Sequence, residues 1–177
     1  MLKRRLLNML LPALAVLPGT KAEAADVNIS GKVIAAACTV SSSLAAGQAV
    51  PLGTLGSTSF QSSGDADPTW HPFTLDLTNC PAGTTTSTAT FSGTPDVTDD
   101  QLFANTEPAA SAATNIAVEV KQSNNSSIVH NGSTMTIEVN ATARTASFPL
   151  EARMKTPLGN VQAGNVSSTM LVDFTYQ

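Results

Sequence analysis

The sequence predicts an all-β protein folded as an immunoglobulin-like sandwich. Apolar and polar residues alternate with a period of two in several short stretches, which places the apolar side chains on one face of a strand. Turn residues separate these stretches, and none of them has a sustained helical period. The chain of 177 residues contains two cysteines, Cys38 and Cys80, which suits the single bridge of such a sandwich.

The first 24 residues have the three parts of a secretory signal peptide. Lys3, Arg4 and Arg5 begin it, an apolar run over residues 6–17 follows, and Ala22-Glu23-Ala24 supplies a small-residue cleavage site. The apolar run is too short to span a membrane as a stable helix. We therefore expect export, cleavage after residue 24 and no membrane insertion of the mature chain.

The mature chain is acidic. Four of the nine basic residues and one of the thirteen acidic residues precede the cleavage site, which leaves five against twelve, a net charge of −7. An acidic domain with few cations does not favour nucleic acids or anionic membranes as partners. The remaining length of about 150 residues predicts one domain with a core of its own.

Residues 25–33 alternate ahead of the first cysteine. The side that carries the apolar residues consists of Ala25, Val27, Ile29, Gly31 and Val33. Polar and charged residues occupy the positions between them. Taken alone, this pattern is typical of an ordinary first strand of a sandwich.

Cys38 and Cys80 are expected to form one disulfide, because an exported chain meets an oxidising compartment. Closing a loop of about 43 residues would stabilise the fold by about 4 kcal/mol in the chain-entropy model. A metal site is not indicated, because C-x-x-C is absent and His71 and His130 lie far from the cysteines in sequence.

Further strands are expected over residues 69–80, 89–92, 115–121, 134–139 and 146–154, each bounded by turn residues. Residues 50–55 form an apolar piece broken by proline and glycine. Residues 124–127 and the pair Asn131-Gly132 are predicted turns, and the pair is a favourable hairpin dipeptide.

The sequence contains no motif for catalysis or for a cofactor. H-E-x-x-H, G-x-S-x-G and a phosphate-binding glycine loop are all absent. His71 near Asp65 and Asp67 is a weak candidate for a metal or acid–base site, against the alternative of a loop histidine among solvated carboxylates. Trp70 is either a sugar-stacking platform or an anchor at the core edge. We predict no enzyme activity, no cofactor and no bound metal.

The last stretch, residues 170–177, has the clearest alternation. Its apolar face consists of Met170, Val172, Phe174 and Tyr176. A strand this apolar would promote aggregation if its edge stayed unpaired. We therefore expect another strand to pair with it.

Four groups of residues resemble a known family. Gly164 is fourteenth from the end, Tyr176 is penultimate, and apolar residues alternate between them. This pattern resembles the C-terminal signature of pilus subunits assembled by the chaperone–usher pathway. The block TWHPFTLDLTNCPAGT, the block ATFSGTPD and the stretch GKVIAAACTV are similar to minor tip-fibrillum subunits of type 1 fimbriae.

The resemblance implies a pilin domain over residues 34–177 that lacks the last strand of its sandwich. It implies a groove, filled first by a periplasmic chaperone and then by the N-terminal extension of another subunit. The residues implied to flank this groove and to bind the chaperone are Gly164, Met170, Val172, Phe174 and Tyr176. Residues 25–33 are implied to be this chain's own donor strand, and Val27, Ile29, Gly31 and Val33 are the donor side chains.

The expected function is that of a minor structural subunit, a linker in the tip of a type 1-like fimbria that supports cell adhesion. The expected partners are neighbouring fimbrial subunits, the periplasmic chaperone and the outer-membrane usher. The subunit would pass through the periplasm to the fimbrium on the cell surface. Two alternatives are a fimbrial adhesin, whose sugar-binding relatives carry an additional N-terminal lectin domain, and a periplasmic sandwich that fills its own groove and acts as a binding module.

Overall fold

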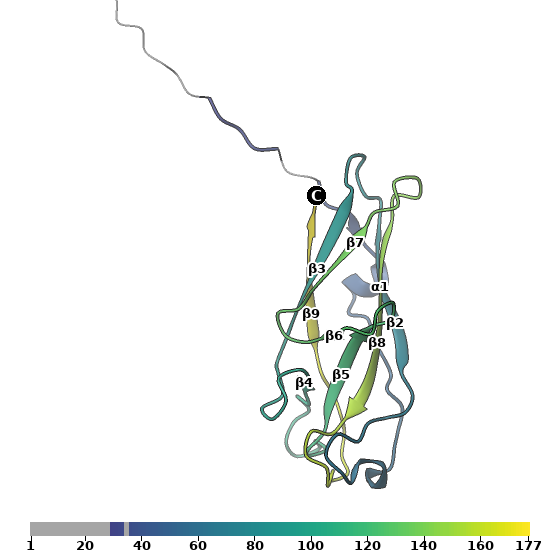
Figure 1. Ribbon diagram of the computed structural model, residues 1–177, viewed down its shortest axis with the longest axis vertical. Helices are drawn as coiled ribbons and strands as arrows, with labels where there is room; N and C mark the ends of the chain where they lie inside the picture. The colour runs from purple at the N-terminus through teal and green to yellow at the C-terminus, as the bar shows by residue number, and fades with distance from the viewer. Residues whose placement is uncertain (1–28, 34–35) are drawn as a thin grey trace, which may run out of the picture. The chain divides into compact units, whose positions relative to one another are not determined.

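The computed structural model describes residues 29–33 and 36–177, within two units, Met1–Lys32 and Val33–Gln177 (Figure 1). The expected signal peptide and Val27 lie outside the described residues. Residues 29–33 form no strand or helix, and the side chain of Val33 is 99% exposed. No helix in the described ranges has the length and apolar character needed to cross a membrane.

The larger sheet of the second unit is antiparallel throughout. Its order is β1 (Thr39–Val40), β2 (His71–Thr78), β8 (Ala146–Lys155), β5 (Ala117–Gln122) and β4 (Phe103–Ala104), and β6 (Ile128–Val129) also pairs with β5. Strand β8 is central and pairs with β2 and β5 over most of its length.

The smaller sheet has β3 (Thr86–Gly93) between β7 (Thr134–Glu138) and β9 (Met170–Tyr176). Strand β9 pairs with β3 along its whole length, from Ser87 opposite Tyr176 to Gly93 opposite Met170. Within the described residues no strand pairs with the other side of β9, which forms an edge of this sheet in Figure 1. The fold is therefore the expected two-sheet sandwich.

The five predicted internal strands and the C-terminal strand are all present, and they correspond to β2, β3, β5, β7, β8 and β9. The sequence pattern missed β1, β4 and β6, because a strand of two residues is too short to show a period. It also missed two single-turn helices, α1 (Ser42–Ala45) and η1 (Ser57–Phe60).

Asn131 and Gly132 form the predicted turn, but not a hairpin. The strands on either side, β6 and β7, belong to different sheets. The turn is bound to β3 instead: Gly132 N–H donates to the carbonyl of Phe91 at 2.8 Å, and Asn131 Oδ1 accepts from Gly93 N–H at 3.2 Å. The dipeptide thus carries the chain from one sheet to the other.

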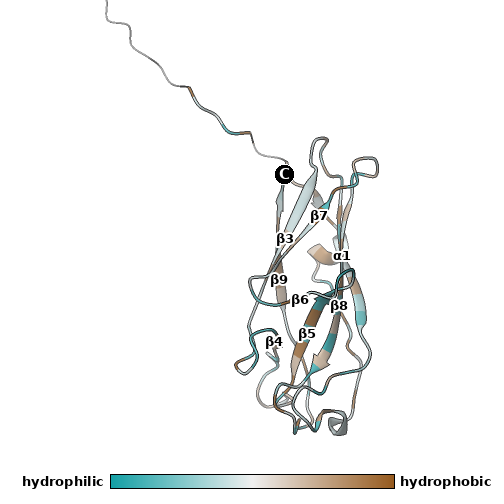
Figure 2. Cartoon of the chain, viewed as in Figure 1, coloured by the Kyte–Doolittle hydropathy of each residue, from teal (hydrophilic) through white to brown (hydrophobic). Residues whose placement is uncertain are grey.

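The main core lies between the sheets and is built from alternate residues of their strands. Its fully buried members include Leu77 of β2, Phe91 of β3, and Phe148 and Leu150 of β8. Burying a side chain of this size contributes about 1.5–3 kcal/mol. A hydrophobic stretch of β5, brown in Figure 2, extends this core. A second cluster consists of Phe60, Ala113, Ile116, Met154 and Val161.

The predicted disulfide is formed between Cys38 and Cys80. Both residues are buried and belong to the main core. The bond joins the residue before β1 to the chain just after β2, two strands that pair with each other. It therefore fixes the start of the domain to the large sheet.

Two prolines lie in strands of the large sheet where an N–H is not needed. Ser41 N–H donates to the carbonyl of Asp76, so alternate residues of β2, including position 72, direct their backbone groups towards the β1 side. Strand β1 does not extend as far as Pro72, which is exposed at an unpaired edge. Pro149 likewise faces the side of β5 at a point beyond the end of that strand.

Candidate strand-binding groove

A groove of about 1210 Å³ lies beside β9 and opens onto the main core. Its lining includes Met170, Val172 and Phe174 of β9 and, from the large sheet, Phe73 and Leu75 of β2. These side chains are apolar and come from both sheets of the sandwich. The groove therefore has the character of a core that is open along one side.

The predicted alternation of β9 is present. Met170, Val172, Phe174 and Tyr176 are half-buried and pack against the main core, while Leu171 between them is 67% exposed. Burial raises the pKa of the Tyr176 hydroxyl. Tyr176 is not among the residues that line the groove, whereas the other three are.

The backbone of β9 presents unpaired groups on the side away from β3. Thr86 and Gln177 exchange two hydrogen bonds, at 3.1 and 3.0 Å, so they are a hydrogen-bonded pair of the ladder. In an antiparallel ladder the next residues alternate. The N–H and C=O groups of Phe174 and of the other three apolar residues of β9 are therefore directed to the open edge.

The opposite wall of the groove is the chain between α1 and η1. Val50 and Leu52 of this wall pack against the core from positions without regular structure. In the part of the chain that the structure describes, residues 48–55 make no backbone–backbone hydrogen bond. Two stretches with free backbone donors and acceptors thus line the groove.

Gly164 lines one end of the groove. A Cβ atom at this position would collide with the backbone of Ala112 and Ala113. Asn165 forms a parallel bridge with Ala112 directly beside it. Glycine is needed here because two chain segments approach too closely for any side chain.

His71, the first residue of β2, and Asp67 form a hydrogen-bonded pair. His71 Nε2 is 3.3 Å from Asp67 Oδ2, and Asp67, which is buried, also accepts from Thr69 N–H at 2.8 Å. Asp65 instead accepts from Ser62 N–H at 2.7 Å. Among the described residues no group of three or more metal-ligating side chains is present. The contact between Asp67 and His71 links the loop to β2.

Trp70 stacks on two cations. Lys121 Nζ and Arg153 Cζ each lie 4.1 Å from the centroid of its ring. Such contacts contribute about 0.5–2 kcal/mol each. These contacts hold Trp70 against β5 and β8 of the large sheet.

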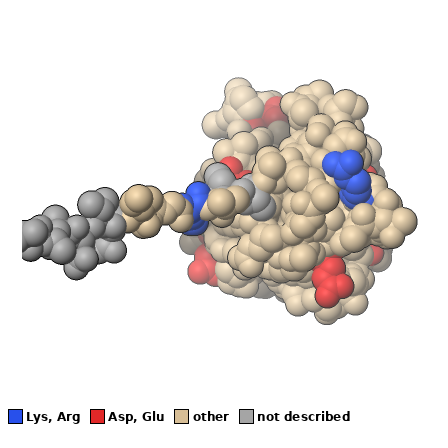
Figure 3. Space-filling model, turned by 90° about the horizontal axis from the view of Figure 1, so that it is seen from above, with Lys and Arg blue, Asp and Glu red and all other residues tan. Residues whose placement is uncertain are grey.

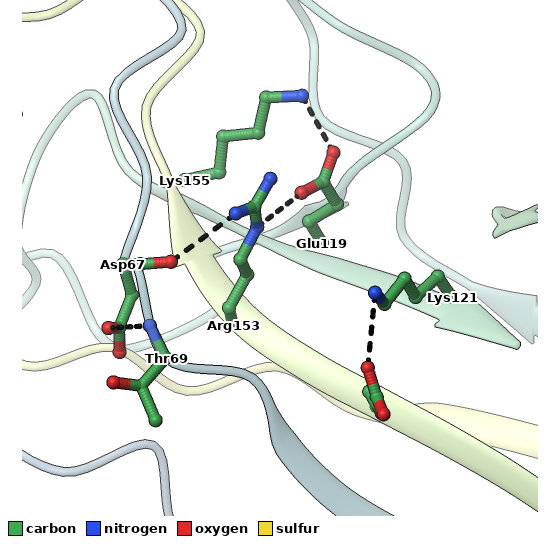
Figure 4. A network of polar contacts seen from close by, with 7 residues as sticks. Asp67, Thr69, Glu119, Lys121, Arg153 and Lys155 are labelled. Atoms are coloured by element: carbon green, nitrogen blue, oxygen red, sulfur yellow. Dashed lines mark hydrogen bonds and ion pairs between the residues drawn. The ribbon is translucent and has the colours of Figure 1, made fainter. Parts of the chain in front are cut away.

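Sequence analysis missed a charged network, drawn in Figure 4, that includes Lys121 and Arg153, the two cations that contact this tryptophan. Buried Glu119 accepts from Arg153 Nε at 2.6 Å and from Lys155 Nζ at 2.7 Å. Burial by itself would raise the pKa of Glu119, but the hydrogen bonds from Lys155 and Arg153 outweigh it and hold the pKa below its ordinary value. The available signal was the charged residues at alternate positions of two predicted strands.

Charged groups elsewhere are sparse. On the face shown in Figure 3 the charged atoms are scattered among uncharged ones. Lys121 is paired with Glu151 at 3.1 Å, so the cations of the charged network are matched by carboxylates. This arrangement stabilises the outer side of the large sheet.

The family model described as "Fimbrial protein" matches residues 27–177. The chain belongs to the fimbrial protein family. Protein FimG of Escherichia coli (strain K12) is 38% identical over 168 residues, which cover 94% of each chain. S-fimbrial adhesin protein SfaS of Escherichia coli O6:K15:H31 (strain 536 / UPEC) is 34% identical over 157 residues, which cover 88% of each chain.

Solved pilus structures share the fold of this fimbrial chain. A structure of a chaperone–usher pilus, solved to explain the uncoiling of its rod, matches with a TM-score of 0.64 at 19% identity and covers 93% of this chain and 100% of the other. The resemblance stated from the sequence is confirmed, and so is the expected role as a subunit of fimbriae exported to the cell surface.

Proposed function

We propose that this fimbrial subunit polymerises by strand exchange, receiving an extended segment of a neighbouring subunit in the groove beside β9. The observation that carries the proposal is the edge of β9, where unpaired backbone groups border an apolar groove. An added strand would pair with this edge, and its alternate side chains would fill the groove. The mechanism is non-enzymatic.

The expected gain in stability is large. Three apolar donor side chains, at about 1.5–3 kcal/mol each, contribute roughly 5–9 kcal/mol before the cost of ordering the donor. Each new backbone hydrogen bond adds about 1 kcal/mol. A subunit with an empty groove should therefore be much less stable than a complemented one.

Residues 25–33 are the proposed donor strand of this chain. Val33 is exposed, and nothing lies within 4 Å of the position that a Cβ atom on Gly31 would occupy. Val27, Ile29, Gly31 and Val33 would face the groove of the recipient, which leaves Asp26 and Asn28 outside. Domain boundaries at residues 24 and 33 follow from this assignment.

The periplasmic chaperone and the outer-membrane usher are the further proposed partners. A chaperone strand would occupy the groove before the donor does, with the groove-lining residues of β9 as its contacts. The 38% identity to FimG supports a minor subunit that acts as a linker in the tip.

The test is thermal unfolding of the mature subunit with and without a synthetic peptide that alternates valine with threonine. We expect the peptide to raise the Tm strongly at saturation. A peptide of the same composition with its valines adjacent is the matched control and should have little effect. An unchanged Tm with the alternating peptide would contradict the proposal.

A fimbrial adhesin is the second candidate, because SfaS, an adhesin by name, matches over 88% of its own length. The length of this chain therefore fits both a structural subunit and an adhesin. A glycan array decides: specific binding by the complemented subunit, lost in Trp70→Ala, would favour the adhesin. The third possibility, a sandwich that fills its own groove, predicts a stable monomer on size exclusion that ignores the added peptide.

A further inference from the structure

The end of the groove near Gly164 is organised around Asn105. Its Nδ2 donates to the carbonyls of Ala113 and Asn165, at 3.0 and 2.9 Å. Its Oδ1 accepts from the N–H groups of Glu107 and Ser167, at 3.2 and 2.9 Å. A carboxamide has two donors and two acceptor sites, so the hydrogen-bonding capacity of Asn105 is fully used.

The two residues after Asn105 hold the same neighbouring segment. Thr106 N–H and Thr106 Oγ1 both donate to the carbonyl of Ser167, at 2.7 and 3.2 Å. Glu107 Oε1 accepts from Asn165 Nδ2 at 3.3 Å. Residues 105–107 thus bind residues 165–167 through main-chain and side-chain contacts across about 60 positions of sequence.

This segment forms the groove wall just before β9. Strand β3 ends at Gly93, opposite Met170, so the chain before Met170 has no partner in the small sheet. Residues 161–169 nevertheless line the groove, and Val166 packs against both the main core and the second cluster. Asn105 supplies hydrogen bonds to this segment that a partner strand would otherwise supply.

Asn105 also contacts the second cluster. Ala113, whose carbonyl it binds, lines the groove and belongs to this cluster. Residues 111–113 lie directly beside residues 164–165: Ala113 N–H donates to the carbonyl of Asn165 at 2.9 Å, and Asn165 N–H donates to the carbonyl of Ser111 at 2.7 Å. Asn105 therefore binds both of these adjoining segments next to the second cluster.

We propose that Asn105 is a positioning residue for strand insertion. It holds residues 164–169 so that an inserted strand continues past Met170 and covers the second cluster. The inference rests on the proposed function of the groove. A loop residue with a merely structural role would instead change the stability of the subunit equally whether or not a strand reached this end.

The test uses the mature chain with an Asn-Gly turn in place of Gln177, followed by an added strand, because the backbone groups of Tyr176 face the open edge and can close such a turn. The turn fixes an antiparallel register beside β9. A short strand of about 7 residues reaches Met170, and a long strand of about 13 residues reaches Gly164, one residue for each that it faces. Denaturant unfolding then measures how much more the long strand stabilises the chain than the short strand does, and this difference is the extension effect.

In the wild-type chain we expect the extension to raise the folding equilibrium constant by about tenfold or more, the change that one or two net hydrogen bonds produce. Asn105→Ala should keep the stabilisation by the short strand and lose that of the extension. Asn140→Ala is the matched control: Asn140 Oδ1 also accepts two N–H groups, from Thr142 and Ala143, but neither of these partners lines the groove, whereas the partners of Asn105 do. It should leave the extension effect intact.

The outcomes are distinct. If neither strand stabilises the wild-type chain, the proposed function fails. If both do, and the extension effect survives in Asn105→Ala, the groove function stands and the positioning role is overturned. If Asn105→Ala does not fold, Asn105→Asp keeps the two accepted hydrogen bonds and the side-chain size, and an undiminished extension effect in that variant would equally overturn the role.

Discussion

The rings of Phe148 and Phe174 lie 5.4 Å apart with an interplanar angle of 52°. Phe148 comes from β8 in the large sheet and is fully buried, whereas Phe174 comes from the edge strand β9 and is half-buried. Their contact joins the two sheets across the core. Because Phe174 also lines the groove, this contact places the groove directly beside the main core.

Phe174→Asp should prevent accumulation of soluble subunit. The substitution removes an aromatic contact, at a cost of about 3 kcal/mol, and places a carboxylate against the core. Periplasmic levels measured by immunoblotting should fall well below those of the wild-type chain. Thr175→Asp, on the exposed face of the same strand and outside the groove lining, is the matched control and should accumulate normally. Equal levels of the two variants would argue against the groove as the binding surface.

Deletions in the donor segment should depend on parity. Removing Ser30 alone shifts the upstream residues by one, so Asp26 and Asn28 would face a recipient groove. Burying them costs several kcal/mol. Removing Asn28 and Ile29 together keeps Val27 on the groove side and only shortens the strand. Pull-down with the neighbouring subunit should show a larger loss for the single deletion; equal losses would mean that the segment is not read in register.

Replacing both cysteines by serine should lower the free energy of unfolding by about 4 kcal/mol, the chain-entropy estimate for a loop of this length. Urea unfolding of the peptide-complemented subunit provides the measurement. Mass spectrometry of the alkylated, non-reduced wild-type chain is the companion experiment. Two alkylated thiols would show that Cys38 and Cys80 are not bonded in the exported protein.

Glu119 should make stability depend on pH in the acid range. Its pKa in the folded state is below the ordinary value of 4.5, because its bonds to Lys155 and Arg153 outweigh the effect of burial. The stability it contributes is therefore fully present above pH 4.5 and is lost as the pH falls through the lowered folded-state pKa.

Glu119→Gln should lower the free energy of unfolding at pH 7 by about 1–3 kcal/mol, because it leaves two cations without their carboxylate. It should also flatten the acid limb of the stability profile measured by urea unfolding. Glu138→Gln, at an exposed position in β7, is the control and should change neither. A Glu119→Gln profile parallel to that of the wild-type chain would contradict the assignment.

Much of the fold follows from local pattern. The alternation over residues 170–177 predicted both the strand and the face of β9 that packs on the core, because a period of two fixes which side chains share a face. The same holds for β2 and β8, whose inward residues Leu77 and Leu150 are buried as expected.

The rest of the site depends on contacts between distant segments. The wall formed by residues 48–55 has no period, because its backbone pairs with nothing in the described chain. Asn105 binds residues about 60 positions away, and no local pattern marks such a residue. The surroundings of Trp70 are set by the pairing of β5 with β8, which brings Lys121 and Arg153 to its ring.

Pro72 has a consequence for the form of any polymer. A subunit with one acceptor groove and one donor strand binds two neighbours, and such subunits join only into unbranched filaments. A third edge that could pair with another chain would let each subunit bind three neighbours, and the filaments would become cross-linked sheets or gels. Because Pro72 lacks the N–H that its unpaired edge would otherwise offer, that edge is poorly suited to pairing with another chain. The missing N–H of Pro72 thus helps to keep such a polymer unbranched.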